Sequence, residues 1–111
     1  MREISPCKLI EYIETNPESL ELIDVRQKYE YLISHLVSSK SIPLPEIEAR
    51  SFEINPQKII VLISRSGMRG ASAAVVLENL ERFSGAQILN LREGLLGVAR
   101  QPLGSLAIIR R

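Results

Sequence analysis

Apolar residues gather in short runs along the chain, separated by polar turns. Residues 59–63 form an unbroken run of isoleucine, valine and leucine. Such a run indicates a strand that is buried on both faces, as in the middle of a parallel sheet. From Ala71 to Phe83 apolar residues recur at helical spacing, and Gly85 is the expected end of that helix. The pattern therefore predicts a strand, a connection of six residues (64–69), and a long helix.

The rest of the chain alternates between shorter strands and helices. Strands are expected over residues 2–5, 20–25, 41–44 and 86–91. Helices are expected over residues 6–16, 29–36 and 93–100, and a helical turn over residues 45–50. The first helix has Ser5 as N-cap and Pro6 at its first position. Strands that alternate with helices predict parallel βαβ units, in a three-layer α/β/α fold with a five-stranded, mainly parallel sheet and a site at the carboxyl ends of its strands. Residues 102–111 give no clear prediction.

The connection between the buried strand and the long helix carries candidate chemistry. It consists of Ser64, Arg65, Ser66, Gly67, Met68 and Arg69. A short turn into a helix N-terminus directs backbone N–H groups at one point, and the helix dipole adds positive charge there. Arg65 and Arg69 would strengthen this field. The sequence thus predicts an anion-binding loop; the alternative is a plain turn with two solvated arginines.

Composition narrows the range of functions. With 111 residues the chain is expected to be one domain, residues 1–111. Fourteen basic and thirteen acidic residues give a net charge of +1, which argues against a nucleic-acid or membrane-surface role. Cys7 is the single cysteine, so no internal disulfide and no cysteine-cluster metal site is expected. No secretory signal or long apolar run is visible, and we expect a cytoplasmic protein without metal or cofactor.

Several segments resemble the motifs of rhodanese-like domains. Residues 63–77 read ISRSGMRGASAAVVL, similar to the family's C-R-S-G-x-R loop and Ala-rich helix. Residues 22–36 read LIDVRQKYEYLISHL, residues 41–44 read SIPL, and residues 90–94 read NLREG, each similar to a family motif in the same order. The resemblance implies a rhodanese-like fold. It also implies that Asp24, Arg26 and His35 are structural residues.

One departure from the family motif governs function, because Ser64 stands where the family has its nucleophilic cysteine. In the family that cysteine is a thiolate that accepts a sulfane sulfur as a persulfide. A serine hydroxyl lacks an accessible anion and needs a neighbouring base to react. The resemblance therefore implies a non-catalytic module that binds a small anion such as thiosulfate or sulfate, a protein partner, or both. Ser34 and Leu95 replace family glycines, and the family's final tryptophan is absent; these are smaller departures.

Other interpretations remain open from the sequence. The chain is a sulfurtransferase if Ser64 is an engineered replacement of a native cysteine, or if Cys7 serves instead. A Ser64–His35 hydrolase pair has no G-x-S-x-G motif to support it. Related phosphatases carry a C-x5-R loop one residue longer, so a phosphate site is the weaker analogy. A sensory or scaffolding domain taken from a longer protein also fits the small size.

Overall fold

A computed structural model of the chain describes residues 2–102 and 107–110. Five parallel strands form one sheet in the order β1-β6-β5-β2-β4. These strands are β1 (Arg2–Ile4), β2 (Leu20–Asp24), β4 (Lys40–Ser41), β5 (Ile59–Ile63) and β6 (Ile88–Leu91). The predicted five-stranded parallel α/β fold is confirmed, and the unbroken apolar run is its central strand.

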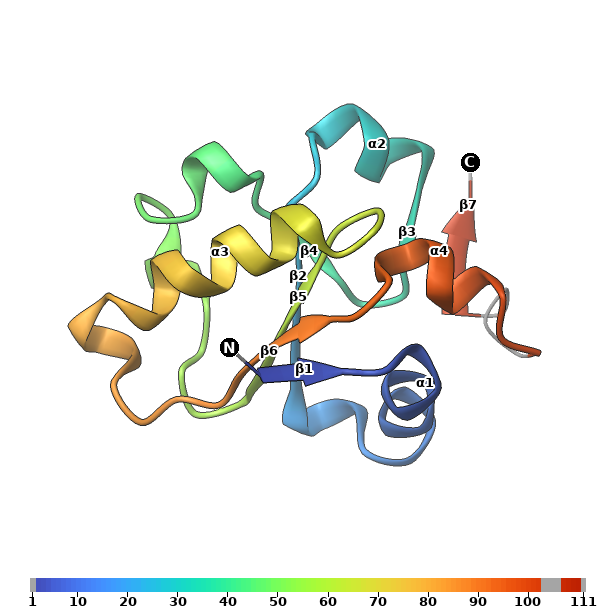
Figure 1. The fold of residues 1–111 in the computed structure, drawn as a ribbon, viewed down its shortest axis with the longest axis horizontal. Coiled ribbons are helices and arrows are strands. Elements are labelled where there is room, and N and C mark those ends of the chain that lie inside the picture. The colour runs from blue at the N-terminus through green and yellow to red at the C-terminus, as the bar shows by residue number, and fades with distance from the viewer. Residues whose placement is uncertain (1, 103–106, 111) are drawn as a thin grey trace.

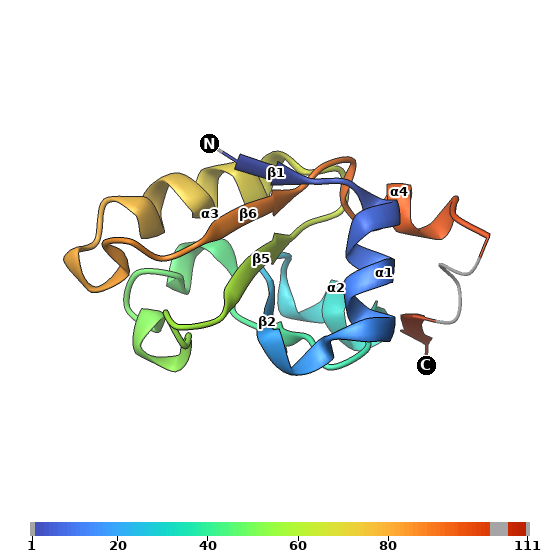
Figure 2. The same cartoon turned by 90° about the horizontal axis from the view of Figure 1, so that it is seen from below.

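Helices cover both faces of this sheet (Figures 1 and 2). They are α1 (Pro6–Thr15), α2 (Lys28–Ile33), α3 (Met68–Glu78) and α4 (Gly94–Ala99). Short 3-10 turns lie in the connections that precede β2, β5 and β6: η1 (Pro17–Ser19), η2 (Leu44–Glu46), η3 (Ser51–Glu53) and η4 (Glu81–Phe83). Ser5 caps α1 as predicted, since its side chain accepts a hydrogen bond from the Lys8 N–H. None of the described helices is long and apolar enough to cross a membrane.

The side chains of β5 explain why its sequence is apolar without interruption. Val61 and Ile63 belong to the cluster that packs against α1 and α4. Ile60 and Leu62 point the other way, into the cluster under α3. All four are completely buried. A strand covered by helices on both faces needs apolar residues at odd and even positions alike, because successive side chains alternate between faces.

The predicted helix boundaries were wrong in two places that shape the site. The helix expected over residues 29–36 ends at Ile33, and β3 (Ser34–Leu36) follows it. This strand pairs antiparallel with β7 (Ile108–Arg110), so the C-terminal stretch that gave no prediction forms half of a second, two-stranded sheet. The long helix begins at Met68, earlier than predicted, and its regular part ends at Glu78. Met68 and Arg69 are thus helical residues.

Two strands are shorter in the structure than predicted from the sequence. The strand expected over residues 41–44 is β4, which covers only Lys40 and Ser41 and is followed by the turn η2. Proline at positions 43 and 45 accounts for this, because proline has no N–H to donate to a neighbouring strand. The strand expected over residues 86–91 begins at Ile88.

Candidate functional site: the loop after the central strand

The connection from β5 to α3 lies at the carboxyl edge of the sheet, next to α2 and α4 (Figure 1). Gly67 is its last residue before the helix and has a φ of 104°, a left-handed conformation that favours glycine. The turn therefore leads directly into the N-terminus of α3, whose N-cap residue Gly67 has no side chain to accept a hydrogen bond. The first N–H groups of such a helix lack intrahelical acceptors and carry the positive end of its dipole.

Ser64 sits inside this turn and is 1% exposed. Its Oγ accepts hydrogen bonds from the N–H of Gly67 at 3.0 Å and of Gly70 at 3.2 Å. The hydroxyl thus occupies the point at which these two donors converge. Among the described residues, the N–H groups of Met68 and Arg69 have no acceptor, and they remain available to a bound group.

Neighbouring elements hold the turn in place through its carbonyl groups. The Leu95 N–H donates to the Ser64 carbonyl at 2.9 Å, and the Leu96 N–H donates to the Arg65 carbonyl at 3.1 Å. From β6, the buried Asn90 side chain donates to the Gly67 carbonyl at 3.0 Å. Because donors on α4 and β6 hold these carbonyl groups, the N–H groups of the turn keep a single orientation.

The two arginines of the segment behave differently. The Arg69 guanidinium forms a two-point ion pair with the Glu30 carboxylate of α2, at 2.6 and 3.1 Å. Its charge is therefore neutralised by Glu30, and its role in the structure is to join α3 to α2. Arg65 is exposed and makes no ion pair or hydrogen bond through its side chain with the residues that the structure describes. Its charge remains open to a ligand.

Asp24 and Arg26 form a buried pair behind the site. The Asp24 carboxylate accepts from the backbone N–H, Nε and Nη2 of Arg26, at 2.8 to 3.1 Å. Arg26 also donates to the Ser34 carbonyl at 2.6 Å, where α2 ends and β3 begins. The polar groups of both side chains are engaged in these contacts, which link β2 to the β3–β7 sheet.

The structure does not bring the other candidate residues to Ser64. His35 lies in β3, its ring stacks on Tyr31 at 4.0 Å between centroids, and its Nδ1 lies 2.9 Å from the Tyr31 carbonyl. Cys7 is exposed in the first turn of α1. Within residues 2–102 and 107–110, no group of three or more histidine, cysteine, aspartate or glutamate side chains could hold a metal ion. Ser66 and Met68 are exposed.

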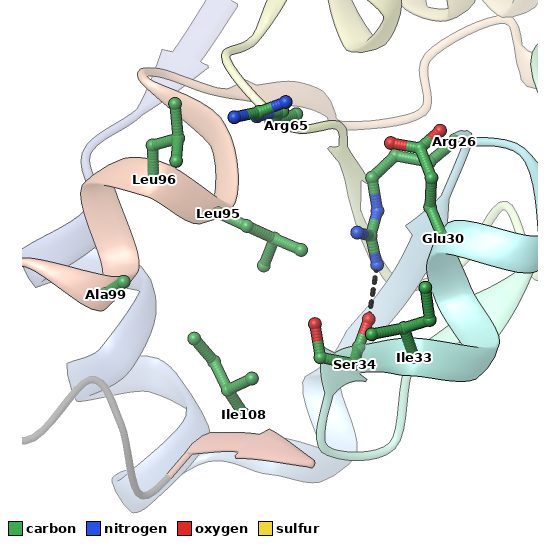
Figure 3. Close-up of a pocket in the computed structure, with 9 residues that line it drawn as sticks. All are labelled: Arg26, Glu30, Ile33, Ser34, Arg65, Leu95, Leu96, Ala99 and Ile108. Atoms are coloured by element: carbon green, nitrogen blue, oxygen red, sulfur yellow. Dashed lines mark hydrogen bonds between the residues drawn. The ribbon is translucent and has the colours of Figure 1, made fainter. Parts of the chain in front are cut away.

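A pocket of about 290 Å³ opens beside the turn (Figure 3). Its lining comes from four parts of the chain: Arg26, Glu30, Ile33, Ser34, Arg65, Leu95, Leu96, Ala99 and Ile108. We call this cavity the loop-side pocket. The sequence did not predict this pocket, because three of its walls come from the end of α2, from α4 and from β7, which become neighbours only through the second sheet.

The contact of Asn90 with the turn was not predicted either. Its signal in the sequence is that Asn90 is the one polar residue in the buried strand β6.

The family model described as "Rhodanese-like domain" matches residues 5–101. The chain belongs to this family. Among curated relatives, this rhodanese-like domain is 33% identical over 78 residues to the Bacillus subtilis protein named "Putative sulfur carrier protein YrkF". It is 31% identical over 74 residues to the B. subtilis "Uncharacterized protein YqhL". The matches cover 70% and 67% of this chain but only 40% and 56% of those proteins.

Solved structures agree on the fold of the rhodanese-like domain. A rhodanese-like domain protein of Staphylococcus aureus matches with a TM-score of 0.76 and 22% identity, over 87% of this chain and 90% of its own. A rhodanese-related protein of Thermoplasma volcanium matches with a TM-score of 0.73 and 24% identity, over 86% and 87%. At these identities the likeness shows the shared fold.

The Glu30–Arg69 pair predicts an acid-sensitive contribution to stability. The hydrogen bond from Arg69 is the main cause that lowers the pKa of Glu30 below its ordinary value. Because the folded-state pKa is depressed, the contribution is complete above the unfolded pKa of about 4.3 and is lost as the pH falls through the folded value. We expect Glu30→Gln to reduce the free energy of unfolding at pH 7 by about 1 kcal/mol, and the difference from the unmodified chain to be smaller at pH 3, below the unfolded pKa.

Urea unfolding at the two pH values measures this difference. Glu14→Gln serves as the control, since Glu14 is exposed on α1 and should have no effect. A difference for Glu30→Gln that stays constant between pH 7 and pH 3 would contradict the assignment to the ion pair.

Proposed function

We propose that this rhodanese-like domain is a non-catalytic module that binds a small anion at the turn after β5. Ser64 takes the place of the family's nucleophilic cysteine in this proposal. The observation that carries it is the Ser64 hydroxyl, buried and accepting from the N–H of Gly67 and Gly70. The free N–H groups of Met68 and Arg69, the α3 dipole and the Arg65 charge supply the attraction for an anion such as thiosulfate or sulfate.

The surroundings of Ser64 argue against catalysis. A serine nucleophile needs a base that accepts its proton, and the groups that contact its Oγ are N–H donors. The histidine that could act as a base is engaged with Tyr31. An oxygen atom also cannot hold a transferable sulfane sulfur as a cysteine persulfide does.

A protein partner is the second part of the proposal. Large apolar side chains are exposed on the elements that flank the turn: Tyr29, Leu32, Ile33, Met68 and Leu96. Such side chains support docking of another protein at the same edge of the sheet. The chain spans about half the length of the curated relatives that it matches.

A sulfurtransferase is the rival function. It is favoured by the printed name of one relative, "Putative sulfur carrier protein YrkF", and by the donor geometry around residue 64, which suits a thiolate as well as a hydroxyl. It requires that Ser64 replaces a cysteine of the native gene, or that Cys7 serves as the nucleophile instead.

Thiosulfate titration, followed by the backbone amide signals in NMR, tests the proposal. We expect saturable shifts at Met68 and Arg69 with a dissociation constant on the order of 1 mM, and none at residues of the amino edge of the sheet. Sulfate should compete. We also expect no thiocyanate when cyanide is added. Absence of saturable shifts would contradict anion binding, and steady thiocyanate formation would contradict the non-catalytic assignment.

A further inference from the structure

The loop-side pocket combines apolar walls with a charged edge. Its apolar lining consists of Ile33, Leu95, Leu96, Ala99 and Ile108. In Figure 3, Leu95 and Ile108 project into the opening, Ile33 lies on the opposite side, and Arg65 lies along its upper edge. The pocket therefore presents an apolar surface that begins where the turn and its arginine end.

Of the three charged residues that line the pocket, Arg26 and Glu30 are paired with side chains of opposite charge. The Arg26 charge is matched by Asp24, and the Glu30 charge by Arg69. Arg65 has no ion-pair partner among the residues that the structure describes. An occupant that complements this lining carries a single negative charge at the turn and an uncharged apolar body beyond it.

We infer that the loop-side pocket binds a small monoanion with a short apolar chain. The anionic head lies against Arg65, the residue of the turn that lines the pocket, and the chain lies among the side chains of α2, α4 and β7. This inference rests on the proposed function and names the class of ligand for it. The volume of about 290 Å³ lies at the lower end of the range for small-molecule sites and suits a short chain.

A series of linear alkanesulfonates tests this inference, because the head group stays constant while the chain grows. Methane-, ethane-, propane- and butanesulfonate are titrated into the protein, below their micellar concentrations, with NMR shifts as the readout. We expect the dissociation constant to fall about threefold with each methylene, or about 30-fold across the series. The shifts should extend from the turn to Leu95 and Leu96 as the chain lengthens.

Two variants separate the head from the chain. Arg65→Gln should weaken every member of the series about tenfold and leave the dependence on chain length unchanged. The double change Ile33→Ser and Leu96→Ser should leave methanesulfonate binding intact. It should reduce the gain in affinity from methanesulfonate to butanesulfonate to about fivefold. Ile33 and Leu96 are 61% and 40% exposed, so the domain should fold without them.

Matched controls remove the same kinds of group elsewhere. Arg2→Gln removes a positive charge at the start of β1, on the opposite edge of the sheet from the turn. Val75→Ser with Phe52→Ser removes two exposed apolar side chains that do not line the pocket. Neither control should change binding or its dependence on chain length.

The outcomes distinguish this inference from the proposed function. If methanesulfonate binds but longer chains bind no better, the anion site stands, and the apolar walls serve another occupant such as a protein side chain; the inference is then overturned. If no sulfonate binds, both fail. A chain-length dependence that the Ile33 and Leu96 changes leave untouched would place the chain elsewhere and also overturn the inference.

Discussion

Replacing Ser64 by cysteine is expected to give a chain without sulfurtransferase activity the ability to transfer sulfur from thiosulfate to cyanide. The introduced thiol would point at the N–H groups of Gly67 and Gly70, which converge on the serine oxygen. Together with the N-terminus of α3, these donors favour the thiolate and should lower its pKa below the ordinary ~8.5. We expect turnover on the order of 1 s⁻¹ in Ser64→Cys and none above background in the chain as it stands.

The expected reaction balances without a cofactor. The thiolate attacks the outer sulfur of thiosulfate, the sulfur–sulfur bond breaks, and sulfite leaves with the bonding electrons. The persulfide then gives its outer sulfur to cyanide, so that thiocyanate forms and the thiolate returns. The free N–H groups of Met68 and Arg69 and the charge of Arg65 are placed to hold the incoming dianion.

Thiocyanate detected by its iron complex measures this result. Ser64→Ala is the matched control, since it changes the same position without supplying a sulfur atom, and it should stay silent. Silence from Ser64→Cys in a folded protein would show that the turn does not activate a thiol, and would leave the domain with binding functions alone. Turnover by the unmodified chain would instead direct attention to Cys7.

The sequence predicted the part of the fold that depends on local pattern. The apolar run 59–63 favours a strand covered on both faces, and Ser5-Pro6 favours the start of a helix, and both are found. The small sheet formed by β3 and β7 could not be predicted in this way. Its two strands have three residues each and pair across about seventy positions of sequence, so they are too short to show a hydrophobic pattern that would predict them.

In the candidate site too, features formed by consecutive residues were predictable and those formed by distant residues were not. The turn was predictable because its residues are consecutive and because the family motif is recognisable in them. The partner of Arg69 was not predicted, although Glu30 is part of a family motif, because the two residues lie 39 positions apart and an arginine in an anion-binding motif suggests a ligand contact. The loop-side pocket depends on tertiary neighbours throughout, and sequence pattern gives no measure of the space between them.

The largest loss of stability is expected from Gly94→Ala, at the start of α4. Gly94 has a φ of 57°, and an added Cβ would overlap the carbonyl oxygens of Ser64 and Arg65 and lie 2.5 Å from the Arg65 carbonyl carbon. These are backbone atoms of the turn and cannot rotate away. We expect about 3 to 5 kcal/mol of destabilisation, from left-handed strain together with overpacking.

Gly85→Ala separates the two causes. Gly85 has a φ of 80°, but an added Cβ would meet no atom within 4 Å, so only the left-handed strain of about 1 to 2 kcal/mol applies. Chemical unfolding measures both variants, and thiosulfate titration reports on the turn. If α4 fixes the turn, Gly94→Ala should lose thiosulfate binding even in conditions where it is folded, while Gly85→Ala binds normally. Equal destabilisation by the two changes would contradict close packing of α4 on the turn, because strain at one residue would then account for both.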